Sequence, residues 1–175
     1  MKNIKFFLYS LLIILLIPIK SYSLIEVDIT RGNLNPLPVA VSPMSIDKKS
    51  KKSFESLLKK KNIGEEISSI VENNLRTSGL FNPLSKDAFL QAPDIANLKP
   101  RFEDWNLIKA QALITGKVSL VDKKLRVEFR LWDVLAAKEM MALAFTTVPN
   151  NWRRVGHIIS DKVYERLTGE KGYFD

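Results

Sequence analysis

Residues 112–133 read A-L-I-T-G-K-V-S-L-V-D-K-K-L-R-V-E-F-R-L-W-D, and their pattern decides the fold. Apolar and polar residues alternate on both sides of Asp122-Lys123, and an alternation of period two predicts strands with one buried face. Asp122-Lys123 itself predicts a tight turn between the two strands. A third alternating run follows at residues 141–145. The stretch and its continuation therefore predict three successive strands that form a meander.

Two longer segments have a helical period instead. Apolar residues recur at every third or fourth position in residues 62–78, and acidic residues occupy the first turn, where the helix dipole favours them. Residues 152–167 repeat the helical pattern with apolar residues at every fourth position. A short helix is expected at residues 101–108. Residues 82–100 are expected to be mostly loop, because three prolines interrupt them.

Two strands are expected upstream of the first long helix. Residues 24–30, L-I-E-V-D-I-T, alternate with period two, and residues 39–44 form a second run bounded by prolines. A strand at the start of an exported chain either pairs inside its own sheet or adds to the sheet of a partner, and the residues leave both open. The fold class predicted from the whole pattern is α/β, of the mixed α+β kind, with helices covering a sheet.

The first 23 residues have the order of a secretory signal. Lysines precede an apolar run at residues 6–19, and Ser21-Tyr22-Ser23 supplies small residues where a signal peptidase reads. A membrane-spanning helix needs about 20 consecutive apolar residues, and this run is shorter and ends at a lysine. We expect cleavage between Ser23 and Leu24, so that the mature chain is exported.

The positive charge of the mature chain is concentrated in one segment. Residues 24–175 hold 24 basic and 19 acidic residues, and residues 47–61 alone hold seven lysines against two acids. The rest of the mature chain balances at 17 against 17, which excludes a uniformly basic nucleic-acid surface. The lysine run is either a solvated loop that leads into a helix or a contact for anionic lipid or polysaccharide.

Residue types argue against an enzyme. The chain has no cysteine and one histidine, His157, which excludes thiol nucleophiles and the usual His/Cys zinc sites. Motifs for a phosphate loop, a nucleophile elbow or a metalloprotease are missing from the sequence. We expect His157 to make a surface or interface hydrogen bond rather than to act as a general base. No catalytic, cofactor-binding or metal-binding residues are therefore predicted, and no cofactor.

Four segments carry a family resemblance. The runs I-G-E-E-I at 63–67 and N-L-R-T-S-G-L-F-N-P-L at 74–84 resemble the first helix of the TolB family and its exit. Two central strands of that family are similar to I-T-G-K-V at 114–118 and F-R-L-W-D at 129–133. The run W-R-R-V-G-H at 152–157, with its continuation to Gly172, resembles the helix that closes the family's amino-terminal domain just before the propeller. The chain is thus similar to the amino-terminal domain of TolB, a periplasmic component of the Tol–Pal system of Gram-negative bacteria.

The resemblance implies a fold and a kind of partner. The fold is a five-stranded mixed sheet with helices on both faces, like the anticodon-binding domain of synthetases, a likeness that gives no reason to expect nucleic-acid binding. The family's first mature strand engages the carboxy-terminal domain of TolA. The corresponding partner-binding residues here are Ile25, Val27, Ile29 and Gly32. Trp152 and His157, on the helix that precedes the family's β-propeller, are expected to contact that propeller.

The chain departs from the family pattern at two places. The lysine run at 47–61 looks like an insertion, and the chain stops where the family's propeller, which holds the lipoprotein Pal, begins. We expect a signal peptide at 1–23, a partner-binding strand at 24–33, the α/β domain at 34–172 and the start of a missing propeller at 173–175. The chain would then be a fragment, and Pal would bind only where a propeller is present.

The function expected from these observations is a protein–protein interaction in the periplasm. The chain would be a monomeric, non-enzymatic component of the Tol–Pal system, peripheral to the membranes, that binds TolA and supports outer-membrane integrity and constriction during cell division. The alternative is an exported ligand-binding module that contacts anionic lipid or cell-wall polymer through the lysines of residues 48–61.

Overall fold

The computed structural model describes residues 35–59 and 62–175. The predicted signal segment and the strand predicted at residues 24–30 lie outside these residues. Six strands form one sheet: β1 (Leu37–Val41), β2 (Ser45–Ile46), β3 (Phe81–Pro83), β4 (Ala112–Val121), β5 (Lys124–Asp133) and β6 (Lys138–Thr147). The order across the sheet is β3-β1-β4-β5-β6, and the two-residue β2 pairs with β4 beyond the end of β1.

The sheet is mixed because its two halves have different connections. Strands β3, β1, β2 and β4 are parallel neighbours, whereas β4, β5 and β6 are antiparallel. Strands β4 and β5 pair over their full length, from Ala112 opposite Asp133 to Val121 opposite Lys124. Asp122 and Lys123 form the two-residue turn with φ of 50° and 61°, the positive values that tight hairpin turns need. The predicted meander and its turn are confirmed.

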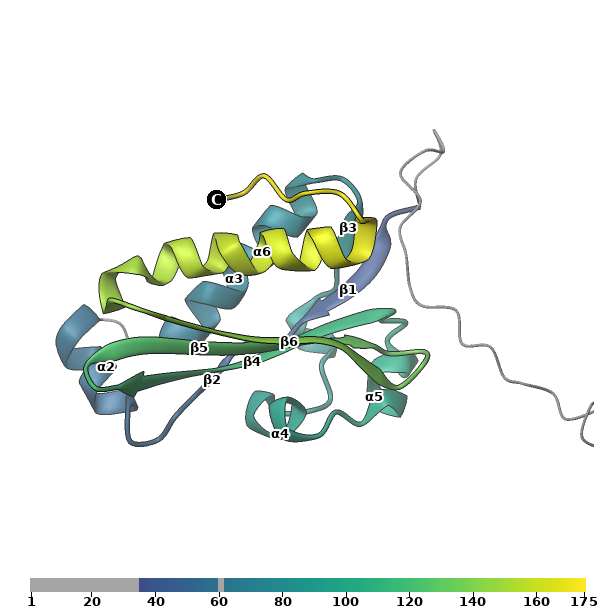
Figure 1. Ribbon diagram of the computed structural model, residues 1–175. Helices are drawn as coiled ribbons and strands as arrows, with labels where there is room; N and C mark the ends of the chain where they lie inside the picture. Colours follow the sequence, from purple (N-terminus) through teal and green to yellow (C-terminus); the bar gives the residue numbers. More distant parts are fainter. Residues whose placement is uncertain (1–34, 60–61) are drawn as a thin grey trace, which may run out of the picture.

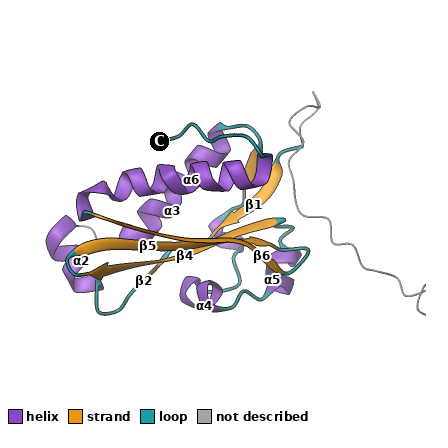
Figure 2. Ribbon diagram, viewed as in Figure 1, coloured by secondary structure: helices purple, strands orange, loops and turns teal. Residues whose placement is uncertain are grey.

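Helices cover both faces of the sheet (Figures 1 and 2). The long helices α3 (Ile63–Thr77) and α6 (Trp152–Thr168) lie on one face, and the short helices α4 (Pro93–Leu98) and α5 (Phe102–Leu107) lie on the other. Helix α2 (Lys51–Leu58) lies at the end of the sheet that holds the β4–β5 turn. The predicted α/β class, a mixed sheet with helices on both faces, is confirmed. No helix among the described residues is both long and apolar enough to cross a membrane.

Two hydrophobic cores stabilise the layers. The larger core lies under α3 and α6 and includes the fully buried side chains Ile67, Leu75, Phe129, Ile159 and Leu167. A smaller core lies under α4 and α5 around Trp105, together with Ala40, Ala96, Ala110, Leu113 and Val134. Among the described residues, the buried members of both cores lie between Leu37 and Leu167.

The expectation that residues 82–100 are mostly loop was wrong. Strand β3, the short 3₁₀ helix η1 (Lys86–Ala88) and helix α4 occupy much of the segment. The buried Gln91 amide explains the order: its Oε1 accepts hydrogen bonds from Trp105 Nε1 (3.1 Å) and from the Arg101 amide (3.0 Å). Its Nε2 donates to the Lys99 carbonyl (3.0 Å). Pro93 stands in the first turn of α4, where proline needs no amide hydrogen bond.

Hydrogen bonds of the Ser68 side chain connect the segment between β1 and β2 to α3. Its hydroxyl accepts a hydrogen bond from the Met44 amide (3.0 Å) and lies 3.1 Å from the Ser42 carbonyl, and all three residues are buried. We expect Ser68→Ala to lower the free energy of unfolding by roughly 1–3 kcal/mol. The Ser42 carbonyl would lose the hydroxyl beside it, and the Met44 amide would keep only its longer bond to the Gly64 carbonyl (3.4 Å). Urea unfolding followed by circular dichroism measures this. The neighbouring Ser69→Ala, at an exposed position, is the matched control, and equal midpoints for the two variants would contradict the proposed role.

Candidate functional site

Gly156 of α6 packs directly against Ile70 of α3. A Cβ atom on Gly156 would stand 2.9 Å from Ile70 Cγ2 and 3.0 Å from Ile70 Cβ, which is closer than side chains pack. Position 156 lies inside a regular helix, so its backbone conformation does not require glycine. Glycine is required because no larger side chain fits against Ile70. The contact brings the polar side chains of the two helices within hydrogen-bond reach of each other.

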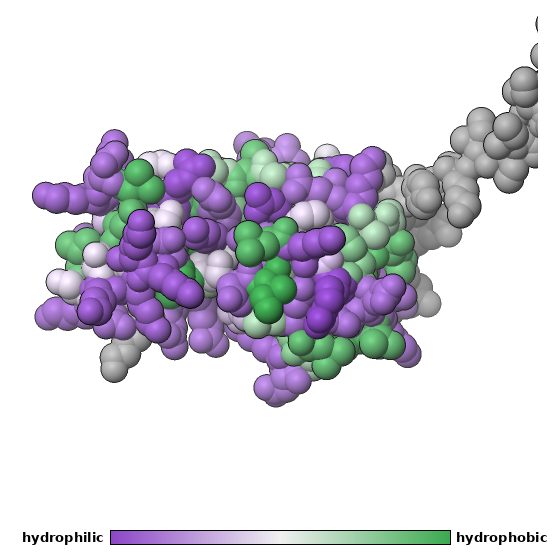
Figure 3. Space-filling view, turned by 90° about the horizontal axis from the view of Figure 1, so that it is seen from below, coloured by the Kyte–Doolittle hydropathy of each residue, from purple (hydrophilic) through white to green (hydrophobic). Residues whose placement is uncertain are grey.

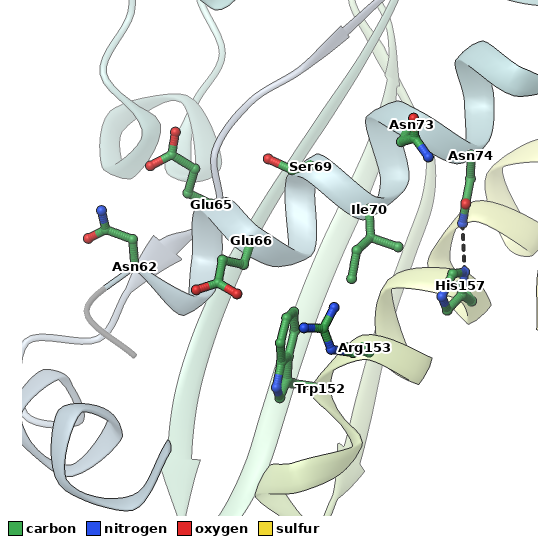
Figure 4. Close-up of a pocket in the computed structure, with 10 residues that line it drawn as sticks. All are labelled: Asn62, Glu65, Glu66, Ser69, Ile70, Asn73, Asn74, Trp152, Arg153 and His157. Carbon is green, nitrogen blue, oxygen red and sulfur yellow. Dashed lines mark hydrogen bonds between the residues drawn. The ribbon is translucent and has the colours of Figure 1, made fainter. Parts of the chain in front are cut away.

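A buried amide connects α3 to α6 beside this contact. Asn74 Nδ2 donates to His157 Nδ1 (2.9 Å) and to Ser160 Oγ (3.0 Å), and Ser160 Oγ donates to the Gly156 carbonyl (2.9 Å). Figure 4 shows the Asn74–His157 bond bridging the helices. Because an amide NH₂ group only donates, Nδ1 is the acceptor, so the neutral ring carries its proton on Nε2. The hydrogen bond predicted for His157 is present.

An open groove of about 680 Å³ runs between α3 and α6 on the outer surface. Asn62 and the carboxylates of Glu65 and Glu66 line the end formed by the start of α3 (Figure 4). Trp152, Arg153 and His157 line the side formed by α6. The Arg153 guanidinium carbon lies 4.5 Å from the centroid of the Trp152 ring, a cation–π contact. The groove therefore joins an acidic and amide-rich wall to a wall that offers a cation, an indole and an imidazole.

The chemistry of the groove favours docking over bond-making. Ser160 is the hydroxyl nearest to His157 in the hydrogen-bond network, but it is buried and donates its proton to the Gly156 carbonyl. Among the described residues, no group of three or more His, Cys, Asp or Glu side chains could hold a metal ion. The groups that remain on the surface are hydrogen-bond donors, acceptors and charges that another protein surface can pair with.

The segment after α6 folds back along the same helix. Gly169, with φ of 77°, ends α6 in the left-handed conformation that glycine adopts without strain. Asp161 then accepts hydrogen bonds from the Phe174 amide (2.7 Å) and the Asp175 amide (3.2 Å) through its two carboxylate oxygens. Tyr173 and Phe174 pack edge-on against Tyr164, and Figure 1 shows the end of the chain lying over α6.

An ion pair fixes the last residue near the beginning of α6. Arg154 donates to Asp175 through Nε (2.9 Å to Oδ1) and through Nη2 (3.1 Å to Oδ2). The hydrogen bonds and charge of Arg154 lower the pKa of the Asp175 carboxyl, and Asp175 in turn raises the pKa of Arg154. The end of the described chain is therefore held by Arg154, the residue that follows Trp152 and Arg153 in the first turn of α6.

The structure brings together only some of the residues named from the sequence. Trp152 and His157 line one groove, although Trp152 is largely buried and His157 is half-buried. The predicted partner-binding residues Ile25, Val27, Ile29 and Gly32, and the cleavage positions Ser23 and Leu24, lie outside the described residues. Sequence reasoning missed Asn74. The available signal was its position three residues after Val71, which places an amide on the apolar face of the helix.

Comparison with known proteins identifies the family. The sequence profile of the TolB amino-terminal domain matches residues 25–140. The chain belongs to the TolB amino-terminal domain family. This TolB-family chain is also 78% identical over 167 residues, or 95% of its length, to the Tol-Pal system protein TolB of Pelagibacter ubique (strain HTCC1062). It spans 37% of the length of that relative.

One solved structure supports the same fold, and a second shows a weaker likeness. The crystal structure of TolB from Acinetobacter baumannii matches with a TM-score of 0.62 at 21% identity, covering 85% of this chain and 32% of that chain. The LpoB C-terminal domain from Salmonella enterica matches with a TM-score of 0.42 at 12% identity, over 67% of this chain and 86% of that chain. The first likeness confirms the fold predicted from the resemblance to the TolB family.

The Gly156–Ile70 contact can be tested with a double-mutant cycle. We expect Gly156→Ala to lower the free energy of unfolding by roughly 1–3 kcal/mol, because the added methyl group forces the two helices apart. In an Ile70→Ala background, which removes most of the colliding atoms, the same substitution should cost far less. Chemical denaturation of the four proteins gives the coupling energy. A coupling energy near zero would mean that the helices do not depend on this contact.

Proposed function

We propose that this chain is the amino-terminal domain of a periplasmic TolB-type component of the Tol–Pal system. The observation that supports this most is its 78% identity, over almost its whole length, to a protein named as the Tol-Pal system protein TolB. The role would be non-enzymatic: to bind partner proteins in a machine that maintains the outer membrane and acts in constriction during cell division. An open groove lined by charged, amide and aromatic side chains is consistent with such a role.

We infer that TolA binds residues 24–33 by strand addition. The described sheet offers this segment little room of its own. Strand β1 has β3 on one side and β4 on the other, so no free edge lies directly beside it. The described edges are β3, which has three residues, β2, which has two, and β6, which lies three strands away from β1. Since a three-residue edge gives few backbone hydrogen bonds, a longer edge on a partner is the more favourable acceptor.

The side chains of the segment would supply the specificity. Ile25, Val27 and Ile29 alternate with Glu26 and Asp28, so that one face of an added strand is apolar and the other is acidic. The apolar face would fill pockets on the TolA sheet, and the backbone would supply affinity. Gly32 would end the strand and let the chain turn toward β1.

Two substitutions on the apolar face test this binding mode. We expect Val27→Asp together with Ile29→Asp to weaken binding to the carboxy-terminal domain of TolA by roughly 100-fold or more, because two charges would enter apolar pockets. Calorimetric titration of residues 24–175 measures the loss, and a chain that starts at Leu34 should not bind.

The control changes the opposite face of the same strand. Glu26→Ala together with Asp28→Ala should reduce affinity by less than about tenfold, since exposed charges contribute little. Circular dichroism of all variants checks that each one is folded, so that a change in affinity can be assigned to the strand itself. Unchanged affinity in the Asp double variant would rule out strand addition, and no binding by the parent chain would rule out TolA as the partner.

We further propose that the α3–α6 groove contacts a following domain in longer proteins of this family. Support comes from the tail, which places Asp175 against Arg154, so that any further residues begin beside Trp152 and His157. The groove's two walls offer charges of both signs to such a domain. Binding of Pal would require that domain.

Hydrogen exchange can locate this contact. In a fusion of residues 24–175 to the remaining length of the Pelagibacter relative, amides of residues 152–157 should exchange roughly tenfold more slowly than in residues 24–175 alone, because the contact suppresses local opening. Amides of α4, on the opposite face of the sheet, serve as the internal control and should not change. Equal exchange of residues 152–157 in both proteins would exclude the groove as the interdomain contact.

A further inference from the structure

We propose that one end of the domain, the lysine tip, binds the surface of a membrane that contains anionic lipids. The lysine tip consists of Lys52 and Leu57 on α2 and of Val121, Lys123 and Lys124 at the β4–β5 turn. This function is separate from the proposed binding of TolA, because it uses none of residues 24–33. The sequence shows only the lysine run at 47–61, and the fold adds the lysines of the turn.

Helix α2 is held firmly beside the β4–β5 turn. Phe54, on its inner side, is 1% exposed and belongs to the larger core. Ser50, just before the helix, accepts a hydrogen bond from the Leu120 amide through its Oγ (2.9 Å), and the Asp47 amide donates to the Val118 carbonyl (2.9 Å). These contacts make α2 and the end of the hairpin one rigid surface.

The two elements meet in a groove that both apolar and basic side chains line. Lys52 and Leu57 come from α2, and Leu120 and Lys123 come from the hairpin, with Ser53 and Ser56 between them. Leu57 is 57% exposed and Val121 is 47% exposed, so both side chains can contact another surface beside these lysines. Figure 3 shows hydrophilic side chains interrupted by apolar ones at this end of the molecule.

The lysines of the tip have no carboxylate partner. None of the ion pairs between described residues includes Lys52, Lys123 or Lys124. Asp47 is already paired with Lys117, 3.3 Å from its Nζ, and that contact lowers the pKa of the Asp47 carboxyl. Residues 48–59 and 122–124 together hold seven lysines against Glu55 and Asp122. The tip therefore keeps a positive charge that it does not neutralise internally.

This combination of side chains fits a lipid surface better than a nucleic acid. Arginine and aromatic side chains, which read bases and stack on them, do not occur in residues 48–53, 55–59 or 120–125. Lysines attract anionic headgroups, and each one near the surface raises binding roughly fivefold. Leu57 and Val121 can enter the boundary between headgroups and acyl chains, which a soluble polyanion does not offer. Lysine stems extend along that boundary with their charges in water.

Vesicle co-sedimentation tests the proposal. The parent protein is residues 24–175, the mature chain expected after cleavage, because the apolar segment at residues 6–19 would itself bind lipid. We expect binding to vesicles of phosphatidylcholine with 30% phosphatidylglycerol (roughly the anionic content that gives a strong surface potential) and not to pure phosphatidylcholine. The triple variant Lys52→Gln, Lys123→Gln, Lys124→Gln should bind roughly 100-fold less tightly.

A matched variant separates a specific surface from overall charge. Lys99→Gln, Lys109→Gln, Lys138→Gln removes the same charge from exposed positions outside the tip. This variant should bind within about threefold of the parent, because the three lysines follow α4, follow α5 and begin β6 and do not belong to the proposed surface. Leu57→Ser with Val121→Ser should weaken binding without changing its dependence on salt. Equal losses in the two lysine variants, absence of binding by the parent, or tighter binding to a DNA oligonucleotide than to vesicles would overturn the proposal.

Discussion

The full-length pairing of β4 with β5 is the constraint on which the rest of the domain depends. Because the ten pairs run without a break, every second residue of both strands faces α3 and α6, and Ile114, Val118, Val127, Phe129 and Leu131 are all buried there. The free edge of β4 then accepts β1 and β2 in parallel. A shift of one residue would turn the whole apolar set to the opposite face, so the turn at Asp122 and Lys123 fixes both cores at once.

The elements that the sequence predicted are those whose signal is local. Strands β4, β5 and β6 and helices α3 and α6 carry long periodic patterns, and each was found at or near its expected position. Strand β3 and helix α4 have three and six residues, which is too few to show a repeating pattern of apolar residues. They are ordered by distant partners instead: β3 by pairing with β1, and the segment around α4 by the Gln91 side chain. Such partners become visible only once the chain is folded.

The candidate site likewise contains residues that could be named from the sequence and residues that could not. Trp152 and His157 could be named because they lie in a motif that resembles the family's last helix. Their surroundings could not, because Asn74 is separated from His157 by 83 positions and Ile70 faces Gly156 only when the two helices cross. The lysine tip is a similar case, since Lys123 and Lys124 belong to the segment that balances in charge along the sequence. Folding adds them to the lysines of α2 and produces a surface that composition alone does not reveal.

The geometry of the sheet also determines how the two proposed contacts relate to each other. Strand β1 begins near the Ala112 end of β4, where Val39 pairs with Ala112, whereas the lysine tip lies at the Val121 end. Nine residue steps along a strand separate these ends by about 30 Å, several times the Debye length at physiological ionic strength. Charges at the tip therefore exert little force at the end of the sheet where β1 begins. A domain that contacts a membrane through its lysine tip would keep the opposite end, where β1 begins, away from the lipid and accessible to a second protein. Because the sites share no residues, substitutions at one should add to those at the other without coupling.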